Sequence, residues 1–334
     1  MNHPNPRRDD MTATPVIQVE HLRKSYGSTL AVEDVSLTVH RGEIVGILGP
    51  NGAGKTTTVE CLAGLRDRDS GHVDVLGLDP ARDRAALREV LGMQLQESEL
   101  PARITAREAA ELYASFYADP ADPLELLDDL GLADRRDAQF RALSGGQKQR
   151  LSIALALVGN PQVAVLDELT TGLDPQARRD TWDVVRKVRD RGVTILLVTH
   201  LMEEAERLCD RIVLIDAGRV VATGTPAELA AQSAGEHVLR FRSPEPGVAA
   251  VLAGVPGVHG FDGPDDGLAY EVRGGPEVVQ DVMVALSAAG VRANDVRLER
   301  GTLEDAFLTL TGQDKPRDAA TGRRSRSLLT RTEA

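Results

Sequence analysis

A glycine-rich stretch at positions 49–56, GPNGAGKT, limits the folds open to this chain of 334 residues. It follows the short apolar run EIVGILG (43–49), which predicts a buried strand, and it precedes KTTTVECLAGL (55–65), which predicts a helix. A strand, a loop of the pattern G-x-x-x-x-G-K-[ST] and a helix together form a phosphate-binding loop at a helix N-terminus. We therefore expect an α/β fold that holds a nucleotide.

The residues of this loop have separate expected roles. Its three glycines let backbone N–H groups curl around the β-phosphate, Lys55 reaches the β- and γ-phosphates, and the Thr56 hydroxyl is a ligand of Mg²⁺. The stretch expected to contact the nucleotide comprises Gly49, Pro50, Asn51, Gly52, Ala53, Gly54, Lys55, Thr56 and Thr57.

A second apolar strand, VAVLDE at 163–168, ends in two acids. In a P-loop enzyme a carboxylate at the C-terminal end of a buried strand holds Mg²⁺, which gives this role to Asp167. The next residue, Glu168, is placed to orient or deprotonate the attacking water. Alone, an acidic pair after a strand is usually a solvated turn. After a phosphate loop it indicates a P-loop nucleotide hydrolase.

The chain divides into four segments. Residues 1–15 lack the apolar region of a signal peptide and are expected to be a disordered leader. Strands alternate with helices over 16–232, which predicts a parallel, helix-covered core sheet with an antiparallel edge sheet near its start and a helical subdomain in its middle. Residues 237–312 predict a small α+β domain of ferredoxin-like order, closed by the helix TLEDAFLTLTG. The polar residues 313–334 are expected to form a disordered tail.

Composition excludes several function classes. The formal net charge of −12 argues against a nucleic-acid binder, which usually needs a basic face. Cys61 and Cys209 have no partners at metal-site spacing, and two cysteines suit a reducing compartment. No stretch of 18 or more apolar residues occurs, so any membrane-spanning part must come from another chain.

The stretch LSGGQKQR at 143–150 resembles the signature motif of ATP-binding cassette (ABC) ATPases, and it lies just upstream of the Asp–Glu strand, as in that family. Further landmarks match, in the family's order, at Tyr26, at Gln96 in LGMQLQ, at Asp174 in TGLD and at His200. Taken singly, each would be an ordinary strand or loop residue. Their joint order over residues 16–225 makes the chain similar to this family.

The resemblance implies a role for each landmark. Tyr26 stacks on adenine, Gln96 touches Mg²⁺ and the water, and His200 senses the γ-phosphate. Gln96 also faces the membrane partner. One residue departs from the family pattern: Leu169 stands where the motif DEPT has proline. Since both acids are intact, we expect a local backbone effect and retained activity.

The resemblance also implies a dimer. In the family, two cassettes meet head to tail, and each signature loop covers the ATP held by the other subunit. Residues Gly145 and Gly146 precede a predicted helix, where N–H groups and the helix dipole favour an anion. The residues assigned to nucleotide contacts in this way are Ser144, Gly145, Gly146, Gln147 and Asp174.

Within the family the chain most resembles separate ATPase chains of bacterial exporters of the daunorubicin/doxorubicin-resistance type. This implies ATP and Mg²⁺ as cofactors, a homodimer at the cytoplasmic face of the cell membrane, and a permease on another chain. It implies export of a drug-like, antibiotic or lipid-like substrate, with an importer ATPase as the alternative.

Other P-loop proteins fit less well. Soluble ABC ATPases carry a second cassette, long coiled coils or cysteine-rich modules, and none of these occurs in this sequence. A GTPase would carry an Asn-Lys-x-Asp motif, which is also missing from it.

Overall fold

A computed structural model of the chain describes residues 15–94, 100–233, 237–263, 268–275, 277–299 and 302–311. The predicted tail and the predicted leader, except Pro15, lie outside these ranges, and so does Gln96.

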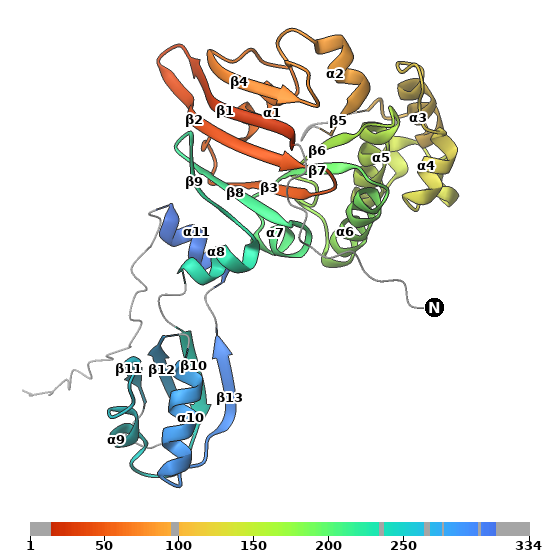
Figure 1. The fold of residues 1–334 in the computed structure, drawn as a ribbon. Helices are drawn as coiled ribbons and strands as arrows, with labels where there is room; N and C mark the ends of the chain where they lie inside the picture. Colours follow the sequence, from red (N-terminus) through yellow and green to blue (C-terminus); the bar gives the residue numbers. More distant parts are fainter. Residues whose placement is uncertain are drawn as a thin grey trace, which may run out of the picture.

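The larger sheet of the described residues has nine strands in the order β4-β1-β2-β9-β8-β3-β7-β6-β5 (Figure 1). The strands from β8 through β3, β7 and β6 to β5 run parallel to one another, whereas β1 pairs antiparallel with β2 and β4. The predicted parallel core with antiparallel N-terminal strands is therefore confirmed. The strands are β1 (Pro15–Tyr26), β2 (Thr29–His40), β3 (Ile44–Leu48), β4 (Ser70–Val75), β5 (Leu91–Gln94), β6 (Val163–Asp167), β7 (Thr194–Val198), β8 (Arg211–Asp216) and β9 (Arg219–Gly224).

The three central strands explain where the site forms. Strands β3, β6 and β7 have the sequences IVGIL, VAVLD and TILLV, and every residue of each is buried. Strands covered on both faces read as continuous apolar runs, as these do. Because they are parallel neighbours, their C-terminal ends meet at one edge of the sheet.

Seven α-helices of the described residues lie between β3 and β8 along the chain. Alanines and leucines of α3, α4 and α5 pack in the same hydrophobic core as β6 and β7, and Figure 1 shows α3 and α4 beyond β5, at the side of the molecule. The predicted helical region is thus present. The helices are α1 (Lys55–Leu62), α2 (Arg84–Val90), α3 (Ala106–Ala114), α4 (Pro123–Asp129), α5 (Gly145–Leu157), α6 (Pro175–Asp190) and α7 (Met202–Leu208).

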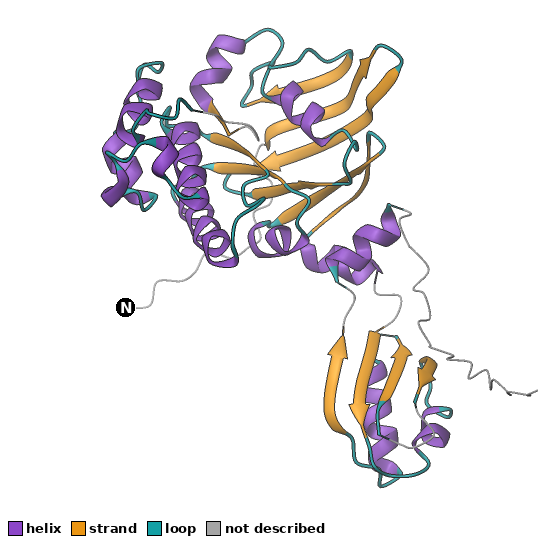
Figure 2. Cartoon of the chain, turned by 180° about the vertical axis from the view of Figure 1, so that it is seen from behind, coloured by secondary structure: helices purple, strands orange, loops and turns teal. Residues whose placement is uncertain are grey.

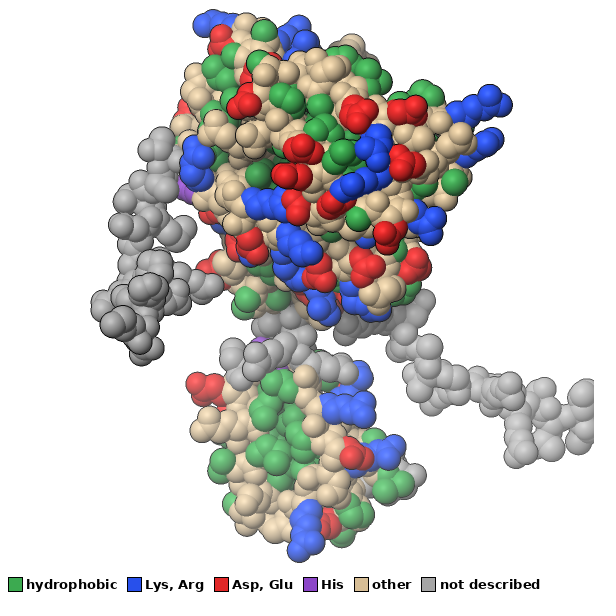
Figure 3. Space-filling model, turned by 90° about the vertical axis from the view of Figure 1, so that its right-hand side faces the viewer, with side chains coloured by type: hydrophobic (Ala, Val, Ile, Leu, Met, Phe, Trp, Pro, Cys, Tyr) green, Lys and Arg blue, Asp and Glu red, His purple; other side chains and the backbone are tan. Residues whose placement is uncertain are grey.

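A second, four-stranded antiparallel sheet has the order β11-β12-β10-β13. Its elements, which we call the small unit, are β10 (His237–Arg242), α9 (Val248–Leu252), β11 (Val258–Asp262), β12 (Tyr270–Gly274), α10 (Val278–Ala288) and β13 (Asn294–Glu299). Helices α9 and α10 cover one face of this sheet with a core of their own (Figure 2). The edge strand β13 leaves Val296 and Leu298 exposed, and hydrophobic side chains gather on the small unit in Figure 3.

The last described helix lies elsewhere than the sequence suggested. Helix α11 (Leu303–Leu310), expected to close the small domain, packs instead against α8 (Pro226–Ser233) and α7. Its apolar side chains meet Leu229, Met202 and the end of β3 at Leu48. An amphipathic pattern predicts a helix with a buried face but does not specify the surface that buries it. The contacts of α11 therefore differ from those expected of a helix that closes the small domain.

Candidate functional site

The phosphate loop has the backbone that its glycines predict. Gly54 caps α1 with φ of +99°, and a Cβ atom there would lie 2.4 Å from the carbonyl oxygen of Ala31. At Gly49 a Cβ atom would lie 2.1 Å from the carbonyl oxygen of Ile215. Any larger residue at either position would push the loop away from the sheet. The loop therefore needs glycine for its shape as well as for its approach to phosphate.

Lys55 is held inside this loop. Its Nζ donates to the carbonyl oxygens of Gly49 at 2.8 Å and Pro50 at 3.0 Å, and the residue is only 7% exposed. Burial lowers the pKa of Lys55, while the nearby carboxylates of Glu168 and Asp167 oppose that change. A phosphate entering the loop would replace two neutral acceptors with charged ones, which bind an ammonium group more strongly.

The last residue of β6, Asp167, and the next residue, Glu168, have different surroundings. Asp167 is buried, and burial raises its pKa to about 6, with the neighbouring charge of Glu168 adding to the rise. Its backbone N–H donates to Oε1 of Gln94 at 3.1 Å, so the end of β5 supports the end of β6. Gln94 is not among the site residues expected from the sequence; its only signal there is an amide at the end of an otherwise apolar strand.

Glu168 and His200 lie together, as their positions after β6 and β7 predict. Oε1 of Glu168 lies 3.2 Å from Nδ1 of His200, with the carboxylate side chain 15% exposed and the imidazole 41% exposed. The backbone N–H of Glu168 donates to the carbonyl oxygen of Val198, and its φ is +49°. A non-glycine residue in this left-handed region costs about 1–3 kcal/mol and persists only where its surroundings hold it.

Leu169, which stands where the family motif has proline, lies in the hydrophobic core. Its side chain is completely buried. A residue before proline is restricted to extended conformations. Leucine leaves Glu168 free to adopt its left-handed backbone. The local backbone effect expected from the sequence is consistent with this geometry.

The signature stretch begins α5 with a capping box. Ser144 Oγ accepts the backbone N–H of Gln147, and Oε1 of Gln147 accepts the backbone N–H of Ser144. The N–H groups of Gly145 and Gly146 find no acceptor among the described residues. Gly145 is exposed, so its N–H can meet an external anion, whereas Gly146 is buried beside Ala177 and the polar groups of Ser144 and Gln147 already satisfy each other.

Asp174 caps the neighbouring helix α6. Its carboxylate accepts the backbone N–H groups of Gln176 and Ala177, and these bonds lower its pKa. A Cβ atom added at Gly146 would lie 3.0 Å from Cβ of Ala177, so the signature and α6 are in contact. Across the described residues, no hydrogen bond or ion pair joins 144–147 to the phosphate loop.

Tyr26 ends β1 and remains 39% exposed. The guanidinium carbon of Arg66 lies 4.9 Å from its ring centroid, within cation–π range. An exposed ring held by a neighbouring cation is suited to stacking on a base, and nothing in its contacts identifies which base.

We expect Tyr26→Ala to weaken ATP binding by roughly 1–3 kcal/mol, the stacking contribution of one base on an aromatic ring. Tyr26→Trp should bind ATP about as well as the unchanged chain, because stacking needs a π-face and not a phenol. Titration with a fluorescent ATP analogue measures both variants. Unchanged affinity in the alanine variant would leave Tyr26 as an ordinary strand residue.

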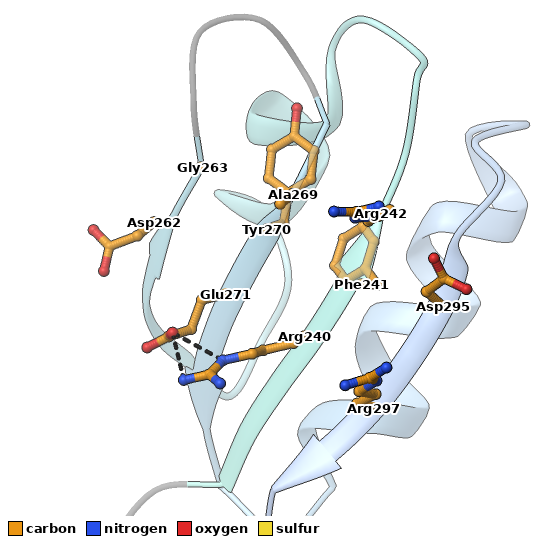
Figure 4. A pocket seen from close by; sticks show the side chains of 10 residues that line it. All are labelled: Arg240, Phe241, Arg242, Asp262, Gly263, Ala269, Tyr270, Glu271, Asp295 and Arg297. Carbon is orange, nitrogen blue, oxygen red and sulfur yellow. Dashed lines mark hydrogen bonds and ion pairs between the residues drawn. The ribbon is translucent and has the colours of Figure 1, made fainter.

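A groove of about 710 Å³ lies away from these residues, on the sheet of the small unit (Figure 4). The rings of Phe241 and Tyr270 stack beside it with their centroids 5.4 Å apart. Nη2 of Arg240 lies 3.1 Å from Oε2 of Glu271, with which it forms an ion pair. Three arginines and three acids line it, so their formal charges cancel. It contains no residue that the sequence assigned to nucleotide chemistry, and we do not place the ATP site there.

Comparison with known sequences identifies a family and several relatives of this chain. The sequence profile of the family described as ABC transporter matches residues 32–171. The daunorubicin resistance ATP-binding protein DrrA3 of Streptomyces coeruleorubidus is 40% identical over 310 residues, which are 91% of this chain and 98% of that protein. The Nod factor export ATP-binding protein I of Ralstonia nicotianae is 36% identical over 94% of this chain and 99% of its own length.

Solved structures match about two thirds of the chain. An ATP-binding subunit of an ABC transporter has a TM-score of 0.59 at 30% identity, covering 65% of this chain and 92% of its own. The ATP-binding cassette MJ0796, solved as a dimer with ADP and Pi after hydrolysis, has a TM-score of 0.57 at 28% identity, covering 63% of this chain and 98% of its own.

Proposed function

The chain belongs to the ATP-binding subunits of ABC transporters, and from this premise we propose how its own residues couple ATP hydrolysis to transport. It is the ATPase subunit of an ABC exporter similar to the daunorubicin resistance and Nod factor export proteins. The proposal rests chiefly on one observation. The phosphate loop, Asp167, Glu168 and His200 all follow parallel strands that end at the same edge of the sheet.

The proposed chemistry is in-line attack of water on the γ-phosphate. Lys55 binds the β- and γ-phosphates, and the loop N–H groups hold the rest of the triphosphate. Glu168 takes the proton of the water or orients it, and His200, in contact with that carboxylate, senses the γ-phosphate. We assign Gln96 to the same water and to the membrane side on the family resemblance alone, because it lies outside the described residues.

Mg²⁺ fits the oxygens present. Thr56 is exposed at the start of α1, and the buried carboxylate of Asp167 has a raised pKa that a cation would lower. No group of three or more His, Cys, Asp or Glu side chains occurs in the described ranges to form an all-protein cage. Mg²⁺ usually takes one or two protein oxygens together with substrate phosphates, whose charge it neutralises.

We propose that two copies of the chain meet head to tail. The N–H groups of Gly145 and Gly146 point from a helix N-terminus without acceptors, and the described contacts do not bring them to the phosphate loop of the same chain. A second copy supplies the missing phosphate. Ser144 and Gln147 shape this loop through their capping box, and Asp174 fixes the adjacent start of α6.

The domain limits also remain a proposal, with an ATPase domain at 16–232 and a small domain from 237. Strand-helix-strand-strand-helix-strand connectivity and the order β11-β12-β10-β13 support a ferredoxin-like fold for the small unit. Since α11 packs on α7 and α8, the small domain should end before that helix.

A separate membrane subunit is proposed to carry the drug-like, antibiotic or lipid-like substrate, with this chain at its cytoplasmic face. In the described part of the chain, no helix is both long and apolar enough to cross a membrane. At the end of α3, Phe116 is 67% exposed and Leu112 is 48% exposed. Neighbouring exposed apolar residues of this kind mark contact surfaces, and we propose this one as the permease contact.

We expect Phe116→Asp to release the chain from the membrane subunit without loss of ATP binding, because the charge would have to be buried at the contact. The measurement is the share of tagged chain that co-purifies with detergent-solubilised membranes from its own cells. Leu268→Asp, on a residue 58% exposed in the small unit, is the matched control. Equal membrane association of the two variants would contradict this assignment.

A further inference from the structure

One carboxylate outside the proposed site is buried in an unusual way. Glu204 lies in α7, four residues after His200, and is fully buried. Its Oε1 accepts two hydrogen bonds, from Oγ1 of Thr170 at 2.8 Å and from Nε1 of Trp182 at 3.1 Å. Its Oε2 has no hydrogen-bond partner and is shielded from solvent.

These two bonds join three separate parts of the site. Thr170 lies two residues after Glu168, in the turn that follows β6. Trp182 belongs to α6, the helix that Asp174 caps beside the signature. Helix α7 itself begins two residues after His200. A single oxygen therefore ties together the turn of Glu168, the helix behind the signature and the helix that follows His200.

Stability alone does not explain this residue. A buried carboxylate with one unsatisfied oxygen carries a desolvation cost, and an apolar side chain of similar size often packs there at least as stably. Buried polar groups that are kept despite this cost can instead specify geometry. The geometry at stake is the 3.2 Å approach of Glu168 to His200 and the left-handed backbone of Glu168.

We propose that Glu204 is a positioning residue for ATP hydrolysis, acting through Glu168 and His200. By holding Thr170, it fixes the turn that carries Glu168 in its strained conformation. Because Glu204 lies in α7 and accepts the indole N–H of Trp182, it also holds α7 against α6. A shift of either helix would therefore change how Glu168 and His200 approach each other. This inference rests on the proposed catalytic role of Glu168.

The test compares two substitutions of Glu204. Glu204→Leu removes the acceptor, and kcat should fall by about 10–100-fold, the size of effect expected from a small misplacement of reacting groups. KM for ATP should stay within about twofold, because the hydrogen bonds of Glu204 go to Thr170 and Trp182 and not to the phosphate loop. Glu204→Gln keeps an amide oxygen for both donors and should recover most of the lost kcat. An unchanged kcat in the leucine variant, or a glutamine variant as slow as it, would overturn the proposal.

Milder variants remove one donor each and guard against a leucine variant that does not fold. Trp182→Phe deletes the N–H, and Thr170→Val deletes the hydroxyl. Each of these variants should lower kcat by a smaller factor than Glu204→Leu does, and each should leave KM for ATP unchanged. A proportional loss of folded protein and activity, or a rise in KM, would instead indicate a purely structural role.

A combined variant separates this inference from the proposed function. If Glu204 acts through Glu168 and His200, adding Glu204→Leu to a chain that carries both Glu168→Gln and His200→Ala should change the residual turnover by less than about twofold. A further large loss would contradict the inference and leave the role of Glu168 intact. Near-normal turnover in Glu168→Gln alone would instead remove the proposed base.

Discussion

Glu168→Gln should lower steady-state ATP turnover by about 10²–10⁴-fold, the usual contribution of a general base. The amide keeps the shape of the side chain and can keep a hydrogen bond with His200, but it cannot accept the proton of the attacking water. The residue does not hold the phosphate loop, so ATP should still bind. The measurements are phosphate release in the presence of Mg²⁺ and equilibrium binding of ATP, on the chain with its membrane subunit in detergent.

Two controls make this result specific. Glu203→Gln changes an exposed carboxylate two residues beyond Leu201, with its side chain 58% exposed, and should hydrolyse ATP normally. Chelation of Mg²⁺ should stop turnover in every variant if Thr56 and Asp167 hold that ion. A closed, ATP-dependent dimer should accumulate only in the Glu168 variant. Turnover near that of the unchanged chain would exclude Glu168 as the base.

Two inactive variants should restore an ATP site when they are combined in one heterodimer. Lys55→Ala removes the loop cation, and Gly145→Asp sets a carboxylate where the signature would receive a phosphate. In a head-to-tail dimer, the phosphate loop of one chain then meets the intact signature of the other. Neither homodimer has such a pair, so ATP held in a closed dimer should occur in the mixture alone.

The structure determines the choice of glycine in this experiment. A Cβ atom at Gly146 would lie 3.0 Å from Cβ of Ala177, so a substitution there would disturb its own chain. At Gly145 the nearest atom would be Cδ2 of Leu173 at 3.4 Å, an ordinary contact. Gly145→Ala is the uncharged control and should still occlude ATP. Photo-crosslinked nucleotide is measured in heterodimers purified through two tags, and its absence from confirmed heterodimers would favour a site within one chain.

That Asp167, Glu168 and His200 lie at one edge of the sheet could be predicted from the sequence, because local signals determine it. Apolar runs identify strands buried on both faces, and parallel strands bring Asp167, Glu168 and His200 to the same edge whatever the details of packing. The phosphate loop is also identified by a short local pattern, although the close contacts that require Gly49 and Gly54 are with the backbones of β8 and β2.

Contacts between distant segments could not be predicted in this way. The bonds of Glu204 to Thr170 and Trp182 join residues 34 and 22 positions apart, and no short pattern encodes them. The left-handed backbone of Glu168 depends on the carbonyl of Val198 in another strand. Likewise, the apolar face of α11 is plain in the sequence, but its docking site on α7 and α8 is a property of the folded chain.

The docking of α11 beside α8 makes the small unit an insertion rather than an appendage. The chain leaves the ATPase domain at α8 and returns to it at α11, so both tethers of the small unit are anchored side by side. Cutting the chain after residue 230 would remove more than the small unit, because it would also uncover the apolar surface around Met202 and Leu229. Deleting only the small unit, and joining α8 to α11 with a short linker, should cost the ATPase domain less stability. Loop-closure free energy changes by only about 0.6 kcal/mol for each doubling of loop length. Exchange of the small unit alone would then leave the packing of α11 against α7 and α8 in place.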